Sequence, residues 1–322
     1  MENMEKKVMT PIVLITGANG FIGSYTTLLF ESLGYRVVPC GRREPRDHDL
    51  SLLPIRTKTV QLDVTDTNAF RELCKRENVT NIVHIAQPRR EENPDVLNFS
   101  YRAMLNILET AKEMNIRRVV FTSSGATYGQ LRKKDDGLIR EDDLVPIFPT
   151  FIYRSSKIIS EWLGDFYARH YGVSFVALRI SSVYGPGQTK GIGGAVKNGI
   201  LGRECRPYLT RIPDDLIFVK DVAQAIRLAC FCERPNSRAY NIASGRPYLE
   251  EDLIGAMRRQ LPEIAFEIGK HPDAATIVTH RQRDILDISL ARKELGFIPE
   301  FDLDKGIFEI AQWAKSEKKG LS

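Results

Sequence analysis

Tyr153 and Lys157 have the residue types and the spacing of a proton-transfer pair. They stand four positions apart, so on a helix their side chains share one face. A tyrosine hydroxyl has an unperturbed pKa of about 10, and a neighbouring ammonium stabilises the phenolate and lowers that pKa. The tyrosine then becomes usable as an acid or a base near neutral pH. Ser124, earlier in the chain, adds a hydroxyl that can orient a substrate oxygen.

The strand before Ser124 decides whether these side chains can meet. Arg118–Ser124 is a mostly apolar run that ends in hydroxyl side chains, and we expect a strand that delivers them at its carboxyl end. In doubly wound sheets that end faces the ligand crevice. A Tyr-x-x-x-Lys pair alone is common and often marks only two neighbours on a helix surface. Its meaning here comes from the order of motifs along the chain: a glycine loop, then the serine, then the pair.

The glycine loop lies near the N-terminus, in Thr16–Gly23. The apolar run Ile12–Ile15 before it indicates a buried strand, and helical spacing of apolar residues follows it. Gly17 permits a tight turn, Gly20 removes a side chain where a pyrophosphate would approach, and Gly23 lets the helix pack against the strand. The loop therefore predicts dinucleotide binding at a helix N-terminus. The alternative is an ordinary glycine-rich turn between a strand and a helix.

The end of the expected second strand, Tyr35–Gly41, bears on the choice of dinucleotide. Gly41 stands where NAD-specific folds carry an acidic residue for the ribose hydroxyls, and Arg42 and Arg43 follow it. A carboxylate would repel a 2′-phosphate, whereas a guanidinium can pair with it. NADP(H) is therefore favoured over NAD(H). The alternative is that the two arginines only begin a solvated loop.

Taken together, these motifs resemble the extended short-chain dehydrogenase/reductases and, among them, the NAD-dependent epimerase/dehydratase family, which acts mainly on nucleotide sugars. Thr122–Gly129 matches the serine-rich strand end of the family, with Ser124 at the catalytic Ser/Thr place. Four later segments also resemble family landmarks: Ser182–Gly187, Phe218–Ala223, Asn241–Gly245 and Glu294–Pro299. The resemblance thus covers nearly the whole chain.

The resemblance implies an α/β fold, namely a doubly wound parallel sheet (Rossmann) with a smaller C-terminal α/β substrate lobe. We expect residues 1–180 to form the dinucleotide-binding domain and residues 181–322 to form mainly the substrate-binding lobe. A segment at about 212–245 is expected to return to the first domain.

Roles for individual residues also follow from the resemblance. Tyr153 would act as acid or base, Lys157 would lower the Tyr153 pKa and contact the nicotinamide ribose, and Ser124 would hydrogen-bond the reacting oxygen. Asp63 would reach the adenine amino group, although a role in a local turn is an equally good interpretation. The expected cofactor contacts are Gly17, Asn19, Gly20, Phe21, Ile22, Gly23, Gly41, Arg42, Arg43, Asp63, Val64, Ile85, Ala86, Tyr153, Lys157 and Ile180.

Some positions depart from the family pattern, and they bear on the substrate. Ser182 stands where an asparagine often holds a substrate diphosphate, and Asp214 falls near the place of an arginine with the same task. Gly125 and Ala126 replace acidic residues that dehydratases and decarboxylases of the family need, which disfavours both chemistries. Other arginines could contact the phosphates, although each is more simply explained as a surface residue: Arg203, Arg206, Arg211 and Arg283.

The favoured function is reversible hydride transfer at a secondary alcohol of a sugar or nucleotide sugar, as in a 4-epimerase, with NADP or NAD as cofactor. One alternative is an NADPH-dependent reductase or dehydrogenase of a non-nucleotide carbonyl or sugar. Another is a catalytically silent NADP-binding regulatory protein, since folds are reused for sensing. Retention of Ser124, Tyr153 and Lys157 together argues against the silent protein.

Composition favours no other class of partner. The net charge of +5 is modest, and Lys and Arg gather only in the terminal Lys315–Lys319 region, so we expect a small-molecule substrate and no nucleic acid. The five cysteines lack paired metal-ligand spacing, so no metal site is expected. No apolar stretch approaches the roughly 20 residues of a membrane span, and Met1–Lys7 is polar. We therefore expect a cytoplasmic protein that binds no membrane.

A homodimer is expected from two apolar helix faces. The helix from about Val96 and the helix beginning near Tyr153 both carry more apolar residues than packing on one sheet requires. In the resembled family these two helices pair with their copies as a four-helix bundle, a closed two-fold arrangement. The alternative is that the substrate lobe of the same chain covers the excess. The apolar residues of the second helix are Ile158, Ile159, Trp162, Leu163, Phe166 and Tyr167.

Overall fold

The structure is a computed structural model. It describes residues 10–42, 53–88, 93–129, 131, 136–143, 152–207, 213–267 and 284–320. Arg43, Arg211 and Arg283, which the sequence pointed to as candidate phosphate contacts, lie outside the described residues.

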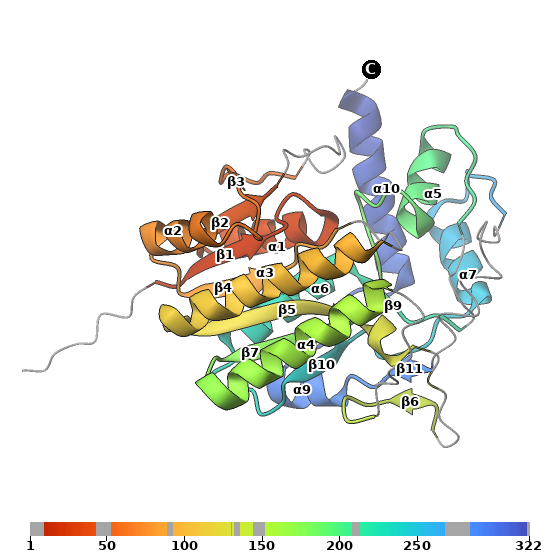
Figure 1. The fold of residues 1–322 in the computed structure, drawn as a ribbon. Coiled ribbons are helices and arrows are strands. Elements are labelled where there is room, and N and C mark those ends of the chain that lie inside the picture. The colour runs from red at the N-terminus through yellow and green to blue at the C-terminus, as the bar shows by residue number, and fades with distance from the viewer. Residues whose placement is uncertain are drawn as a thin grey trace, which may run out of the picture.

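A seven-stranded parallel sheet forms the centre of the molecule, in the order β10-β7-β5-β4-β1-β2-β3. The chain builds outward from β1, first through β2 and β3 on one side, then through β4, β5, β7 and β10 on the other (Figure 1). The order therefore reverses between β1 and β4, and ligands bind outside the carboxyl ends of strands at such a switch point. This arrangement confirms the predicted doubly wound sheet. The strands are β1 (Ile12–Thr16), β2 (Arg36–Gly41), β3 (Val60–Gln61), β4 (Asn81–His84), β5 (Arg118–Ser124), β7 (Phe175–Ile180) and β10 (Ala239–Ile242).

Helices cover both faces of the sheet. Figure 1 shows α3 and α4 side by side in front of it and α6 behind it, and α6 packs against α1. Because both faces are covered, β1 is apolar from Ile12 to Ile15: Val13 and Ile15 pack into one core and Ile12 and Leu14 into the other. The helices are α1 (Phe21–Ser32), α2 (Thr67–Glu77), α3 (Pro94–Glu113), α4 (Ile152–Tyr171), α6 (Val219–Phe231) and α9 (Ser289–Leu295).

A smaller group of elements with its own core is gathered on one side of the sheet (Figure 1). Helix α10 packs against both α5 and α7, and the two-stranded sheet of β8 and β9 contributes side chains to the same core. Strand β8 begins only two residues after β7 ends, so this group starts directly at the carboxyl edge of the large sheet. Its elements are α5 (Gly191–Ile200), α7 (Glu250–Gln260), α10 (Leu303–Gly320), β8 (Ser182–Tyr184) and β9 (Leu216–Phe218). A second small pair consists of β6 (Leu138–Ile139) and β11 (Ile285–Leu286).

The third strand is shorter than its sequence suggests. The run Thr59–Asp66 indicates a strand that leads into a helix capped by Thr65 or Asp66; β3 covers only Val60–Gln61, and Asp66 is the N-cap of α2. The strand ends early because the Asp63 carboxylate accepts hydrogen bonds from both the N–H and the hydroxyl of Thr65, at 2.9 and 2.8 Å. Such local side-chain bonds compete with a strand ladder and favour a turn.

None of the helices in the described ranges combines the length and the apolar character that crossing a bilayer requires. Within those same ranges, no group of three or more His, Cys, Asp and Glu side chains is placed to hold a metal ion.

Candidate active site

Ser124 is the last residue of β5 and pairs with Ile180, the last residue of β7. Its side chain is buried, and Oγ accepts a hydrogen bond of 3.2 Å from the N–H of Ala126 in the 3₁₀ turn Gly125–Tyr128. That bond holds the hydroxyl in place and leaves its proton to be donated. The structure therefore puts an oriented donor at the carboxyl end of the sheet.

Tyr153 and Lys157 lie in the first two turns of α4, which packs against β5. Lys157 is only 3% exposed, and its Nζ donates to the carbonyl oxygen of Thr122 at 2.8 Å. The same Nζ lies 5.6 Å from the centre of the Tyr153 ring and 4.7 Å from that of Phe121. A buried ammonium is thus fixed between strand β5 and the Tyr153 ring, and one face of α4 brings the two side chains together.

His84, at the end of β4, is part of the core. Burial and the Lys157 ammonium both lower the pKa of His84, to about 3, so the ring is neutral near pH 7. Its Nδ1 lies 2.7 Å from the Thr16 Oγ1, and its ring stacks on Phe121. These contacts are typical of a core histidine and not of an acid–base catalyst.

Two of the three glycines in the loop have no room for a Cβ. Gly17 has φ +71°, and a Cβ there would lie 2.7 Å from the backbone nitrogen of Ala86. A Cβ on Gly23 would lie 2.1 Å from the carbonyl oxygen of Gly17. Gly23 therefore allows α1 to approach the loop itself, rather than the strand as the sequence suggested. Gly20 is the N-cap of α1 and has no side chain with which to cap the first turn, so the N–H groups there face the loop side of the helix.

Thr16 ties the loop to the neighbouring strand. Its Oγ1 accepts hydrogen bonds from the N–H groups of Ile85 and Ala86, both at 3.2 Å. These bonds bridge β1 and the end of β4 at the point where the strand order reverses. Sequence reasoning gave Thr16 no role beyond preceding the glycines, although a hydroxyl at a strand end was the available signal.

The residues expected around the adenosine lie at the β1–β2–β3 end of the site. Arg42 is half exposed, and its guanidinium lies 4.0 Å from the Asp63 carboxylate and 5.7 Å from the centre of the Phe99 ring. Asp63 itself makes the Thr65 turn described above. Asn19 accepts a hydrogen bond of 2.7 Å from the Thr59 hydroxyl, which connects the loop to the residue before β3.

The remaining expected contacts are spread over the same edge of the sheet. Val64 and Ile180 are buried, whereas Phe21, Ile22, Gly41, Ile85 and Ala86 are partly buried. The described residues on the list therefore come together along the carboxyl ends of β1, β2, β4, β5 and β7.

Gln87 was not anticipated from the sequence. It follows β4 closely, and its Nε2 donates to Ser100 Oγ on α3 at 3.1 Å and to Ser156 Oγ on α4 at 3.4 Å. Ser156 lies between Tyr153 and Lys157, so one amide joins both helices beside the proton-transfer pair. No motif in the sequence marked this residue.

An acidic pair lies where the smaller lobe begins. Asp214 is 2% exposed, and its carboxylate accepts hydrogen bonds from the N–H of Asp215 at 2.7 Å and from Ser182 Oγ at 3.3 Å. Arg203 and Arg206 are exposed, and Arg206 pairs with Glu204 at 2.8 Å. Among the described residues, a carboxylate and not a guanidinium thus faces Ser182.

Comparison with known proteins places this geometry in a family. The model of the NAD dependent epimerase/dehydratase family matches residues 13–243. A UDP-glucose 4-epimerase from Lacticaseibacillus casei is 25% identical over 96% of this chain and 98% of its own length. A dTDP-4-dehydro-6-deoxyglucose reductase from Escherichia coli is 28% identical over 92% of this chain and 95% of its own.

The fold is also similar to that of a solved dehydrogenase structure. The solved structure of L-threonine dehydrogenase from Clostridium difficile superposes with a TM-score of 0.82 at 24% identity, covering 96% of this chain and 98% of that one. With a family match over most of its length and the expected fold, the chain belongs to the NAD-dependent epimerase/dehydratase family and is an enzyme of the epimerase and dehydrogenase type.

Proposed function

We propose that this enzyme catalyses reversible hydride transfer at a secondary alcohol of a sugar or nucleotide sugar, in the manner of a 4-epimerase. The observation that carries the proposal is the placement of Lys157 Nζ between the Thr122 carbonyl and the Tyr153 ring, beside the strand that ends in Ser124. When bound, a nicotinamide dinucleotide supplies the hydride acceptor and donor.

The chain's own residues move the proton and hold the substrate oxygen. Tyr153 takes the hydroxyl proton as the alcohol is oxidised and returns it on reduction. Lys157 stabilises the phenolate by its charge, which burial leaves weakly screened. Ser124 donates a hydrogen bond to the reacting oxygen in both directions. In an epimerase the ketone stays bound and is reduced on its other face, whereas in a dehydrogenase or reductase it leaves.

The loop before α1 suits a dinucleotide pyrophosphate. The loop backbone forms a cradle that is packed closely against Ala86 at Gly17 and against α1 at Gly23, and the first-turn N–H groups of α1, which follow the N-cap Gly20, have no side-chain cap at the positive end of the helix dipole. Favourable contact with an anion requires close backbone approach, which these positions permit. We assign pyrophosphate binding to this loop, and the nicotinamide end to the edge formed by Ile85, Ala86 and the proton-transfer pair.

NADP(H) is the dinucleotide that Arg42 favours. The Arg42 guanidinium is half exposed, and its contact with Asp63 at 4.0 Å is at the limit of an ion pair. A group so weakly held can turn to a 2′-phosphate at small cost, because exposed ion pairs contribute little. Gly41 adds no carboxylate that would repel the phosphate.

A non-nucleotide substrate is the second candidate. The Asp214 carboxylate bonds to Ser182 at the start of the lobe, and a negative group there opposes a diphosphate. That observation favours a reductase or dehydrogenase of a small carbonyl or sugar over an enzyme for nucleotide sugars. A catalytically silent regulatory protein is disfavoured by the presence of Ser124, Tyr153 and Lys157 in one chain.

A homodimer through α3 and α4 accompanies the proposed function. These two helices pack together, and they expose Tyr101 by 45%, Trp162 by 64% and Tyr171 by 51%. Large aromatic side chains exposed on two adjacent helices are typical of a protein–protein interface. A second copy of the same face would cover them in a closed two-fold arrangement.

Tyr153→Phe tests the assignment with a panel of nucleotide sugars and free sugars. Epimerisation is measured by chromatographic separation of the two epimers, and net oxidation or reduction by NADPH and NADH absorbance. We expect turnover to fall by about 10²-fold or more, because the variant lacks the ionisable hydroxyl, while the calorimetric dissociation constant of the cofactor stays within about twofold. Tyr101→Phe removes a hydroxyl from an exposed tyrosine on α3 and is the matched control. Turnover in Tyr153→Phe within a few fold of the parent would refute the assignment.

A further inference from the structure

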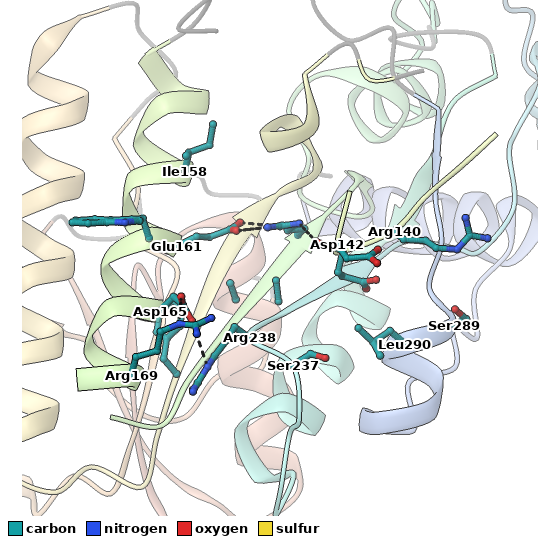
Figure 2. A pocket seen from close by; sticks show the side chains of 16 residues that line it. Arg140, Asp142, Ile158, Glu161, Asp165, Arg169, Ser237, Arg238, Ser289 and Leu290 are labelled. Atoms are coloured by element: carbon teal, nitrogen blue, oxygen red, sulfur yellow. Dashed lines mark hydrogen bonds and ion pairs between the residues drawn. The ribbon is translucent and has the colours of Figure 1, made fainter. Parts of the chain in front are cut away.

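Arg179 of β7 and Glu161 of α4 form a buried ion pair beneath the catalytic helix. The Arg179 Nη2 lies 2.8 Å from the Glu161 Oε2, and Nε lies 3.1 and 3.2 Å from the two carboxylate oxygens. Their side chains are only 10% and 13% exposed. Figure 2 shows Glu161 extending from α4 to its partner across one wall of a cavity.

The cavity itself has a volume of about 720 Å³ and lies between α4 and the β7–β10 edge of the sheet. Its arginines all contact carboxylates of the protein, so the cavity presents paired charges rather than an attractive field for an ionic ligand. The pairs are Arg140 with Asp136 and Asp287, Arg169 and Arg238 with Asp165, and Arg179 with Glu161. We therefore look for the role of this region in the contacts of the Arg179–Glu161 pair and not in a ligand of the cavity.

Those contacts reach the residues on either side of Ser124. The Ser123 hydroxyl donates a short hydrogen bond to Glu161. Arg179 Nη1 donates to the Tyr128 hydroxyl at 2.7 Å, in the turn that follows Ser124. Arg179 is also the neighbour of Ile180, which pairs with Ser124 in the sheet. The ion pair thus contacts the strand, the turn and the neighbouring strand that together fix the Ser124 hydroxyl.

On α4, Glu161 of the ion pair lies on the same helix face as Tyr153 and Lys157. Tyr153, Lys157 and Glu161 follow one another at intervals of four, so they share one face. Lys157 is bonded to Thr122, and Glu161 to Ser123, the next residue of β5. Two anchors on successive strand residues fix both the rotation of α4 about its axis and its position along β5.

We propose that Glu161 and Arg179 are positioning residues, which set helix α4 against β5 so that Tyr153 stands in register with Ser124. The proposal rests on the function proposed above, because it gives Tyr153 and Ser124 a common reacting oxygen. A shift of about 1 Å in a reacting group can cost about 10²-fold in rate. A buried ion pair is also a poor way to gain stability alone, since apolar replacements are often as stable.

Two substitutions at one position separate geometry from charge. Glu161→Asp keeps the negative charge but shortens the side chain, whereas Glu161→Gln keeps the length and removes the charge. If the pair positions the helix, kcat falls in both variants, by about 10-fold or more, with KM and cofactor affinity within about twofold. At position 179 a lysine can remake the ion pair with Glu161, although with a different reach, whereas a glutamine cannot. The kcat of Arg179→Lys is therefore expected to lie between those of the parent and Arg179→Gln.

Glu317→Gln is the matched control. It breaks the Lys197–Glu317 pair of the smaller lobe, which is 15% and 14% exposed and has an N–O distance of 3.0 Å. We expect a loss of thermal stability of similar size to that in Glu161→Gln with kcat unchanged. A kcat loss confined to Glu161→Gln, or kcat within twofold of the parent in both Glu161 variants, overturns the positioning role.

A second measurement tests the proposal without turnover, so it applies if a variant folds poorly or if the parent shows no activity with the panel of sugars. Ser123→Ala removes one anchor of Glu161 and leaves all charges in place. Tyrosine labelled with ¹³C at Cζ reports the ring environment without substrate, and Tyr153→Phe assigns the signal. We expect the Tyr153 signal to move in Ser123→Ala and Glu161→Asp but not in Glu317→Gln. An unmoved signal in both overturns this inference, whereas absence of turnover in the parent with a moved signal counts against the proposed function alone.

Discussion

Replacing Gly23 by alanine gives a sharp test of the cradle, because helix propensity and local packing predict opposite results. Alanine within a helix is normally more stable than glycine by about 0.5–1 kcal/mol. At Gly23, however, the new Cβ would lie 2.1 Å from the Gly17 carbonyl oxygen and 2.8 Å from the Ala18 Cα, where ordinary contact begins at 3.4 Å. Both neighbours are backbone atoms, so the loop must move by roughly 1 Å, at an overpacking cost of about 1–3 kcal/mol.

Gly255→Ala is the control, since Gly255 also lies inside a helix, α7. A Cβ there would lie 3.0 Å from the end of the flexible Arg259 side chain, which can turn away. We expect urea unfolding to show Gly255→Ala equal to or more stable than the parent, and Gly23→Ala less stable by about 1–3 kcal/mol. Calorimetry should show weaker binding of NADPH and NADH alike in Gly23→Ala, because the displaced loop is the proposed pyrophosphate site. Equal stability of the two variants with unchanged cofactor affinity would refute the reasoning.

Three further predictions concern the cofactor, the core and the interface. Arg42→Ala should weaken NADPH binding by about 10-fold or more and leave NADH binding unchanged, as measured by calorimetry, because one charge-assisted contact is lost; equal losses for both cofactors would contradict the assignment. The folded-state pKa of His84, about 3, lies below its unfolded value, so its contribution to stability is present above about pH 6.5 and is lost as the pH falls toward 3, by up to about 1.4 kcal/mol per pH unit. Urea titrations from pH 7 to pH 4 should therefore show a shallower decline in His84→Gln, and an identical slope would show that the ring does not titrate as inferred. Trp162→Lys should convert the proposed dimer to a monomer in light scattering, whereas Phe308→Lys, at an exposed position of α10, should not; a monomeric parent would exclude the interface.

The sheet was predictable where the sequence alone dictates local structure. Short apolar runs without polar alternation mark β1 and the first half of β5, because both strands are covered on both faces. The start of α3 is similarly well marked: Asn93 caps the helix and Pro94 occupies its first turn. The β3 region was less predictable because Asp63 offers the backbone a local turn that competes with the ladder. Such competition is decided by tertiary contacts that no short window of sequence contains.

Some residues of the candidate site were likewise predictable from the sequence, and others were not. Gly17, Tyr153 and Lys157 are recognisable because their function depends on spacing along one turn or one helix. Arg179 and Glu161 are not, because the ion pair joins a strand to a helix and either residue alone resembles an ordinary charged surface residue. This part of the candidate site is therefore defined by contacts between distant segments, which no local sequence motif records.

We propose that the choice of substrate depends on the smaller lobe rather than on the cradle and the proton-transfer pair, since one fold serves many substrates. The decisive contact joins Ser182 of β8 to Asp214, just before β9, at the edge where the large sheet gives way to the lobe. A diphosphate at that edge would face a buried carboxylate, and the interaction of like charges is strong where water is excluded. A neutral or positively charged substrate group meets no such penalty. The panel that identifies the substrate should therefore compare each nucleotide sugar with the corresponding free sugar, and a preference for the free sugar is the result that this carboxylate favours.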